Sequence, residues 1–208
     1  MKKSSGTNRR WMVIAGGMAL LAMISMIGVG LKGGGKAPSD ERTAQRSDPP
    51  GKTGLSPIPV ANGGVKIPEG VEIFESEGQE HVADGVHVFY KTDPPTSGPH
   101  SNRWLPASIY EIGEAKPELL VHNLEHGNVV IYFDRSALSQ SDLEPLVALA
   151  KKHIGQWDGI LLVGRNDKAH PIILTAWRVL LRLKKVDMER VSSFVDAFRG
   201  RGPENPVR

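Results

Sequence analysis

Three of the seven histidines lie in two short segments whose spacing suits metal chemistry. His122 and His126 stand four residues apart in the stretch LVHNLEHG, and His100 ends the stretch PPTSGPH about twenty residues earlier. A spacing of four places two side chains on one face of a helix, and equally on one face of a strand. Converging imidazoles supply the first ligands of a divalent ion, at about 2.0–2.1 Å for zinc. The pair therefore predicts a metal site.

The surrounding residues extend this prediction to a ligand set. His100 follows a stiff proline and glycine loop, which would present it as a third ligand with little entropy left to lose. Glu125 can act as a fourth ligand or as a base, and Asn123 can orient an imidazole. Histidine and carboxylate ligands suit zinc, cupric copper or iron. Five of the six methionines lie at or before Met26, and cysteine is absent, which excludes thiolate sites and disfavours a methionine-rich cuprous site.

Two other readings of the same residues stay open. His122 and His126 can be buried structural histidines that pin the loop at His100, in a structural or interaction module of the cell envelope. The stretch from His122 also fits H-x-x-E-H, the signature of inverted zinc proteases, with Glu125 as the catalytic residue of a metal-dependent hydrolase. A serine hydrolase would need Ser97 or Ser101 as nucleophile, but the chain has no G-x-S-x-G elbow.

Hydrophobic periodicity and turn residues predict an α+β domain that positions these side chains. We expect a small mixed or antiparallel sheet with two to three packed helices, since strands and helices do not alternate strictly. Gly159–Val163 and Ile172–Trp177 are expected to form a hairpin with a long loop. The other expected strands are 71–75, 86–90 and 129–133, and the expected helices are 117–126, ended by Gly127, 139–153 and 187–198.

The chain before this domain predicts a membrane anchor and a flexible stalk. Trp11–Leu31 contains no charge over 21 residues, about the length that crosses a hydrocarbon core of roughly 30 Å. Residues 1–10 carry four cations and are expected in the cytoplasm, which places the rest of the chain outside. Residues 32–66 are rich in glycine, proline and serine and form the stalk. The predicted extracytoplasmic domain spans residues 67–204.

The charge distribution argues against nucleic-acid binding. The four cations of residues 1–10 exceed the formal net charge of +3, so the remainder of the chain is close to neutral. The folded domain therefore lacks the basic patch that such binding requires. The sequence predicts the membrane as a partner, through Trp11–Leu31, and does not identify a protein partner.

Two long motifs and several shorter ones stand out along the chain: His81, Val82, Gly85, Tyr90, Pro94–His100, Trp104, Tyr110, Leu120–Gly127, Val129–Tyr132, Thr175–Trp177, Phe198–Gly200, Pro203 and Glu204. In these motifs the chain resembles the DUF3105 family, whose bacterial members carry an N-terminal membrane segment and have no assigned function. The resemblance implies an architecture and directs attention to the histidine segments. It implies no cofactor, substrate or catalytic residue.

Overall fold

The structure is a computed structural model that describes residues 65–208. The predicted cytoplasmic end, the anchor at residues 11–31 and nearly all of the stalk lie outside the described residues. Within residues 65–208, no helix has the length and apolar character needed to cross a membrane.

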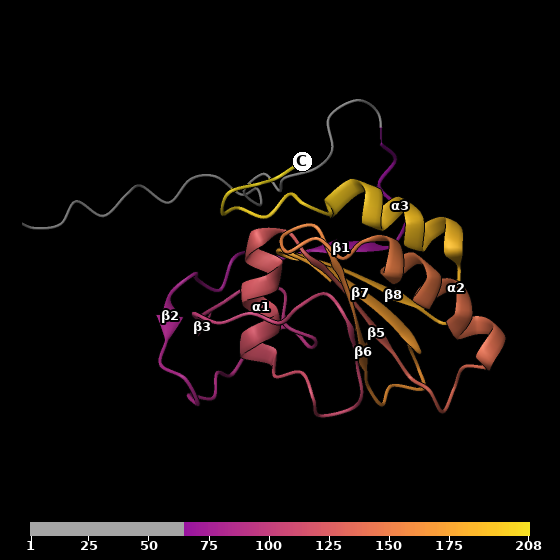
Figure 1. The fold of residues 1–208 in the computed structure, drawn as a ribbon, viewed down its shortest axis with the longest axis horizontal. Coiled ribbons are helices and arrows are strands. Elements are labelled where there is room, and N and C mark those ends of the chain that lie inside the picture. The colour runs from indigo at the N-terminus through magenta and orange to yellow at the C-terminus, as the bar shows by residue number, and fades with distance from the viewer. Residues whose placement is uncertain (1–64) are drawn as a thin grey trace, which may run out of the picture. The chain divides into compact units, whose positions relative to one another are not determined.

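A six-stranded mixed sheet forms the centre of the domain (Figure 1). Its strand order is β1-β8-β7-β5-β6-β4, in which β4, β5 and β6 run parallel and the remaining neighbours pair antiparallel. The strands are β1 (Val71–Ile73), β4 (Ile109–Tyr110), β5 (Val129–Phe133), β6 (Ile160–Gly164), β7 (Ile172–Ala176) and β8 (Val179–Leu183).

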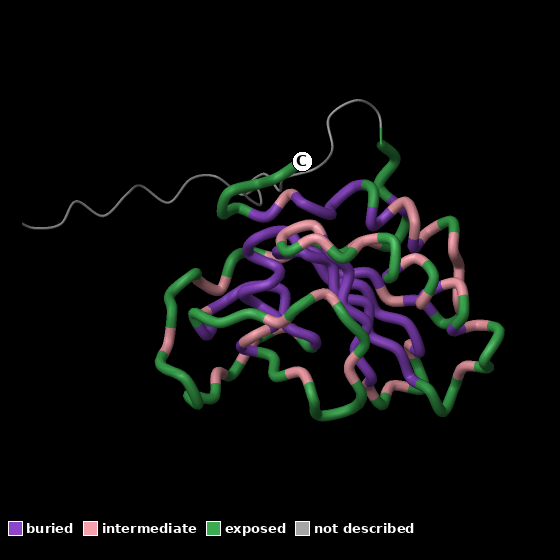
Figure 2. Tube along the Cα trace, in the orientation of Figure 1, coloured by how far each residue is buried: buried purple, intermediate pink, exposed green. Residues whose placement is uncertain are grey.

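The sheet buries both of its faces, because helices cover it on two sides (Figures 1 and 2). Successive residues of β5 point to opposite faces of the sheet and so belong to two different cores. Val129, Ile131 and Phe133 pack with residues of α2 (Gln140–Lys152) and α3 (Met188–Phe198). Val130 and Tyr132 pack on the other face with α1 (Pro117–His126). Fully buried strands read as continuous apolar runs rather than alternating ones, as these do.

A second, two-stranded sheet lies beside α1. It consists of β2 (His81–Val82) and β3 (His100–Ser101), which run parallel and pair His81 with His100 and Val82 with Ser101. These short strands carry two of the histidines that form the candidate site.

The predicted helices are confirmed together with their ends. Pro117 opens α1, where its missing amide costs no hydrogen bond, and Gly127 closes it in the left-handed conformation at φ 111°. Ser139 caps α2 in a capping box with Asp142, and the Asp187 carboxylate accepts the Arg190 amide at the start of α3. The α+β class, the mixed sheet and three packed helices agree with the sequence-based expectation.

Two expectations about strands are wrong, and one strand was not predicted. Residues 86–90 form no strand, because their backbone bonds elsewhere: the Val88 amide donates to the Glu118 carboxylate at 3.0 Å. The strands at Ile160 and Ile172 are not a hairpin, since β5 lies between them. Instead β7 pairs with β8, a strand absent from the prediction, across a two-residue connection in which Arg178 has φ 64°.

Candidate functional site

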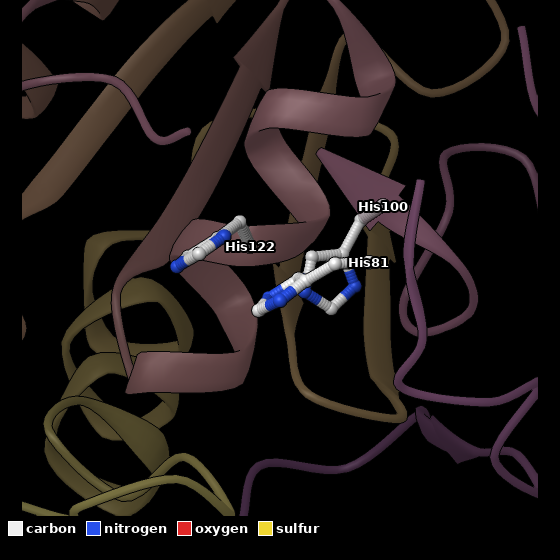
Figure 3. Close-up of side chains that lie close together, drawn as sticks. All are labelled: His81, His100 and His122. Atoms are coloured by element: carbon white, nitrogen blue, oxygen red, sulfur yellow. The ribbon is translucent and has the colours of Figure 1, made fainter. Parts of the chain in front are cut away.

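Three imidazoles from three segments meet between β2, β3 and α1 (Figure 3). His81 lies on β2, His100 on β3 and His122 on α1, and one ring nitrogen of each lies within 4.8 Å of the other two. Ligand atoms of a tetrahedral zinc ion stand about 3.3 Å apart, from bonds of about 2.0–2.1 Å. The three nitrogens are therefore within about 1.5 Å of the separation that a common ion would require.

Backbone carbonyls fix the orientation of the two buried imidazoles. His100 Nδ1 donates to the Gly98 carbonyl at 2.8 Å, and His122 Nδ1 donates to the Ser101 carbonyl at 2.7 Å. A carbonyl oxygen only accepts, so each Nδ1 carries a proton, and in the neutral form of either ring the lone pair is on Nε2. Metal-bound histidines in proteins are held in this way, by a second hydrogen bond from the other ring nitrogen.

Glu125 brings a carboxylate to the same place. Its Oε2 lies 2.9 Å from His100 Nε2, and both residues are buried. The two atoms lie at ion-pair distance, but they lack the alignment of a hydrogen bond. Buried polar atoms without an aligned hydrogen bond are rare in native proteins, because leaving them so is costly.

The electrostatics of the site favour the ionised form of Glu125, the protonated form of His100 and the neutral form of His122. Burial raises the pKa of the Glu125 carboxyl, but the His100 ring beside it outweighs burial, so the pKa lies below its ordinary value. Burial lowers the pKa of His100, yet Glu125, the Gly98 carbonyl and the charge of Glu204 raise it above its ordinary value. Burial also lowers the pKa of His122, which the neighbouring histidines lower further. His122 is therefore neutral at pH 7, as a ligand must be.

His126 lies beside the three imidazoles, next to His122. Its Nε2 is 3.0 Å from His122 Nε2, and its ring stacks on Trp157 with centroids 3.8 Å apart. Because His122 holds its own proton on Nδ1, the hydrogen bond runs from His126 Nε2–H to the lone pair of His122 Nε2. Glu204 Oε2 lies 3.7 Å from the same His126 nitrogen.

The loop that delivers His100 is held by side-chain contacts rather than by regular structure. Tyr90 donates its hydroxyl proton to the Pro99 carbonyl at 2.8 Å, and Ser97 Oγ accepts the Glu77 amide at 3.0 Å. Three prolines at 94, 95 and 99 remove amide donors and restrict φ along the loop. The loop therefore reaches the site with little freedom, as the sequence indicated.

Asn123 anchors the neighbouring loop to α1. Its side chain accepts the Leu105 amide and donates to the Leu105 carbonyl, each at 2.9 Å, and also donates to Asn128 Oδ1 at 3.0 Å. The Asn123 side chain therefore orients the backbone at Leu105 and the side chain of Asn128. Among the described residues, none of its hydrogen bonds reaches an imidazole, although the sequence had suggested this. The two serines of the serine-hydrolase reading are engaged in similar structural contacts, with Ser101 donating to Asp84 at 2.9 Å.

The structure brings His100 and His122 together with His81 and places the Glu125 carboxylate beside His100. His126, which the sequence predicted as a ligand with His122, lies against His122 and is not among the three converging nitrogens. Sequence spacing gave no reason to select His81, which is 19 residues from His100. Its only signal was its place at the start of the family motif. The identity of the ligand set stays a prediction.

Comparisons with known proteins agree with the family resemblance. The model of a family described as "Protein of unknown function (DUF3105)" matches residues 81–208, more than half of the chain. Curated proteins and solved structures give no match. The matched region begins at His81 and contains all of the histidines and carboxylates of the candidate site. The chain belongs to the DUF3105 family.

Proposed function

We propose that this domain binds a divalent transition metal ion, with zinc as the first candidate and cupric copper or iron as the others. His81, His100 and His122 provide the nitrogen ligands, and Glu125 provides the fourth. We further propose that Trp11–Leu31 anchors the chain in the membrane and that the domain lies on the extracytoplasmic side. Its role there is to hold an ion or to pass it on.

One observation carries this proposal: His81, His100 and His122 each bring one ring nitrogen within 4.8 Å of the other two, and the buried His100 and His122 have Nδ1 tied to a backbone carbonyl, which makes Nε2 the ligand atom. Structural histidines normally use both nitrogens when they are buried, because an unpaired polar atom away from water is costly. Here His100 Nε2 faces the Glu125 carboxylate at 2.9 Å without the alignment of a hydrogen bond. A cation between these atoms would satisfy all of them.

The ligand set favours holding an ion over catalysis. Three imidazoles and one carboxylate fill a tetrahedral zinc site, whereas a catalytic zinc keeps one position for water. His100 and His122 are buried while His81 is exposed, so an ion would enter and leave on the side of His81. That asymmetry suits a site that exchanges its ion with a partner.

A structural role for the histidines is the second candidate, because the same hydrogen bonds also pin the loop without a metal. His100 bonds within its own loop, and His122 ties α1 to a carbonyl 21 residues earlier. The two candidates predict different effects of metal: a purely structural histidine cluster binds no ion, so adding or removing metal would not change its stability.

The test is metal analysis of the full chain, purified in detergent without a histidine tag, before and after incubation with zinc. We expect close to one ion per chain. A double variant, His100→Gln/His122→Gln, should lose the ion, while His153→Gln/His170→Gln, which changes two histidines outside the site, should keep it. A parent chain that remains metal-free after incubation at neutral pH, where imidazoles are available to bind, would contradict the proposal and favour the structural role.

A further inference from the structure

The hydrogen of His126 Nε2 has two acceptors nearby, and it can serve only one at a time. In the present arrangement it points to His122 Nε2 at 3.0 Å, while Glu204 Oε2 lies 3.7 Å away. If the proposed function holds, the ion takes the lone pair of His122 Nε2. The His126 hydrogen then loses its acceptor, and the Glu204 carboxylate is the next one within reach.

His126 cannot leave this position easily. Its ring stacks on Trp157 and lies beside His122, with centroids 3.8 and 4.8 Å away, and the residue is only 8% exposed. Its other ring nitrogen, Nδ1, is buried without a hydrogen-bond partner in the described part of the chain. A buried N–H left without an acceptor is costly, so the second acceptor matters in the ion-bound state.

Glu204 belongs to a segment that is docked against the end of α1. We call residues Arg199–Arg208 the C-terminal strap; Figure 1 shows it running from α3 back toward α1. The Gly200 amide donates to the Gly127 carbonyl at 2.7 Å, and the Glu204 amide donates to the Glu125 carbonyl at 3.2 Å. At Gly202, an added Cβ would lie 2.0 Å from that same Glu125 oxygen. The strap therefore approaches the helix backbone as closely as glycine allows.

The strap is also tied to the loop that carries Trp157. Arg199 Nη1 donates to the Asp158 carbonyl at 2.8 Å and to the Asp158 carboxylate at 2.6 Å. Glu204 itself keeps 46% of its side chain exposed. These hydrogen bonds hold the backbone of the strap in place. The exposed Glu204 side chain can still move the short distance to His126.

We propose that Glu204 is a positioning residue of the metal site, which accepts the His126 Nε2 hydrogen when an ion occupies His122. The proposal rests on the proposed function, because it assigns Glu204 a role only in the ion-bound state. Its consequence is a site in which the C-terminal strap sets how tightly the ion is held and how fast it is released. The Glu204 carboxylate touches His126 and need not touch the ion.

The test compares three variants of the full chain by zinc competition with a chelating dye, which gives affinity and release rate. Glu204→Ala removes the acceptor and should weaken zinc binding about tenfold to a hundredfold, from the cost of a buried unpaired donor, with faster release. Glu204→Gln retains an acceptor oxygen and should recover most of the affinity. Glu189→Ala, an exposed glutamate of α3, is the matched control and should change nothing.

A thermal unfolding scan of each variant in excess chelator separates positioning from structural damage. The metal-free midpoint of Glu204→Ala should equal that of the parent, because His126 then has His122 as its acceptor. Unchanged zinc affinity in Glu204→Ala, or Glu204→Gln as weak as Glu204→Ala, overturns the role of Glu204 while the metal site stands. A parent chain that binds no zinc overturns the proposed function itself, so the two failures are distinguishable.

Discussion

His81 and His100 are paired in register across two parallel strands of two residues each. Parallel neighbours direct paired side chains to the same face, and the two rings meet edge to face with centroids 5.0 Å apart. The pairing adds an exposed histidine to a fully buried one. Replacing the exposed His81 therefore tests metal binding with little effect on stability, whereas replacing a buried histidine affects both.

Replacing His81 with alanine should weaken metal binding and leave the metal-free fold unchanged. Among the described residues, no hydrogen bond holds the His81 ring, and its contacts are with the rings of His100 and His122. Loss of a ligand should reduce zinc affinity by at least about tenfold, because even changes to residues behind a ligand cost 10–100-fold. Zinc competition measures the affinity, and urea unfolding in chelator measures stability. His170→Ala is the control; equal affinity in both variants would exclude His81 as a ligand.

Replacing His122 with alanine should destabilise the domain even without metal. The substitution leaves the buried Ser101 carbonyl without its donor and opens a cavity between α1 and β3. Together these effects should lower the free energy of unfolding by about 2–4 kcal/mol. Urea unfolding in excess chelator provides the measurement. A loss as small as that of His81→Ala would mean that the Ser101 contact contributes little.

The elements around the site were predictable where local chemistry decides them. α1, α2 and α3 follow from apolar spacing near 3.6 residues and from end signals at Pro117, Ser139, Asp187 and Gly127. β5 follows from five consecutive β-forming apolar residues. These signals lie within a few residues of one another, so no tertiary contact is needed to interpret them.

The missed features depend on contacts between distant segments. β8 follows β7 without a glycine or asparagine, and Arg178 takes the left-handed conformation in the turn, so the turn carries no sequence signal. Residues 86–90 have strand-like composition, but the Glu118 carboxylate satisfies the Val88 amide. His81 reaches the site only through the pairing of β2 with β3. Spacing along the chain does not reveal pairings of this kind.

Acid should destabilise the domain partly through Glu118. Burial raises the pKa of this carboxyl, but the Val88 and Glu118 amides and the His87 ring outweigh burial, so its pKa lies below the ordinary 4.5. A folded-state pKa below the unfolded one adds stability above the unfolded value, and this stability is lost as pH falls through the folded value. The parent should therefore lose more stability than Glu118→Gln between about pH 6 and about pH 3.5.

Urea unfolding at several pH values checks this expectation. Glu189→Gln serves as the control, because Glu189 is exposed on α3, and its acid dependence should match that of the parent. Parallel curves for the parent and Glu118→Gln would show that the contacts of Glu118 do not favour its ionised form.

Replacing Gly127 with alanine should destabilise the domain by more than its backbone conformation alone explains. Gly127 has φ 111°, and an added Cβ would lie 2.7 Å from the Arg201 amide nitrogen and 2.8 Å from the carbonyl carbon of Gly200. Gly113 has φ 84° with open space around an added Cβ. Gly113→Ala should therefore show only the conformational cost, about 1–2 kcal/mol, and Gly127→Ala should add the cost of displacing the strap. Thermal unfolding of both variants measures the difference. Equal losses would mean that the strap yields freely at this contact, and its backbone would then be too loosely held to position Glu204.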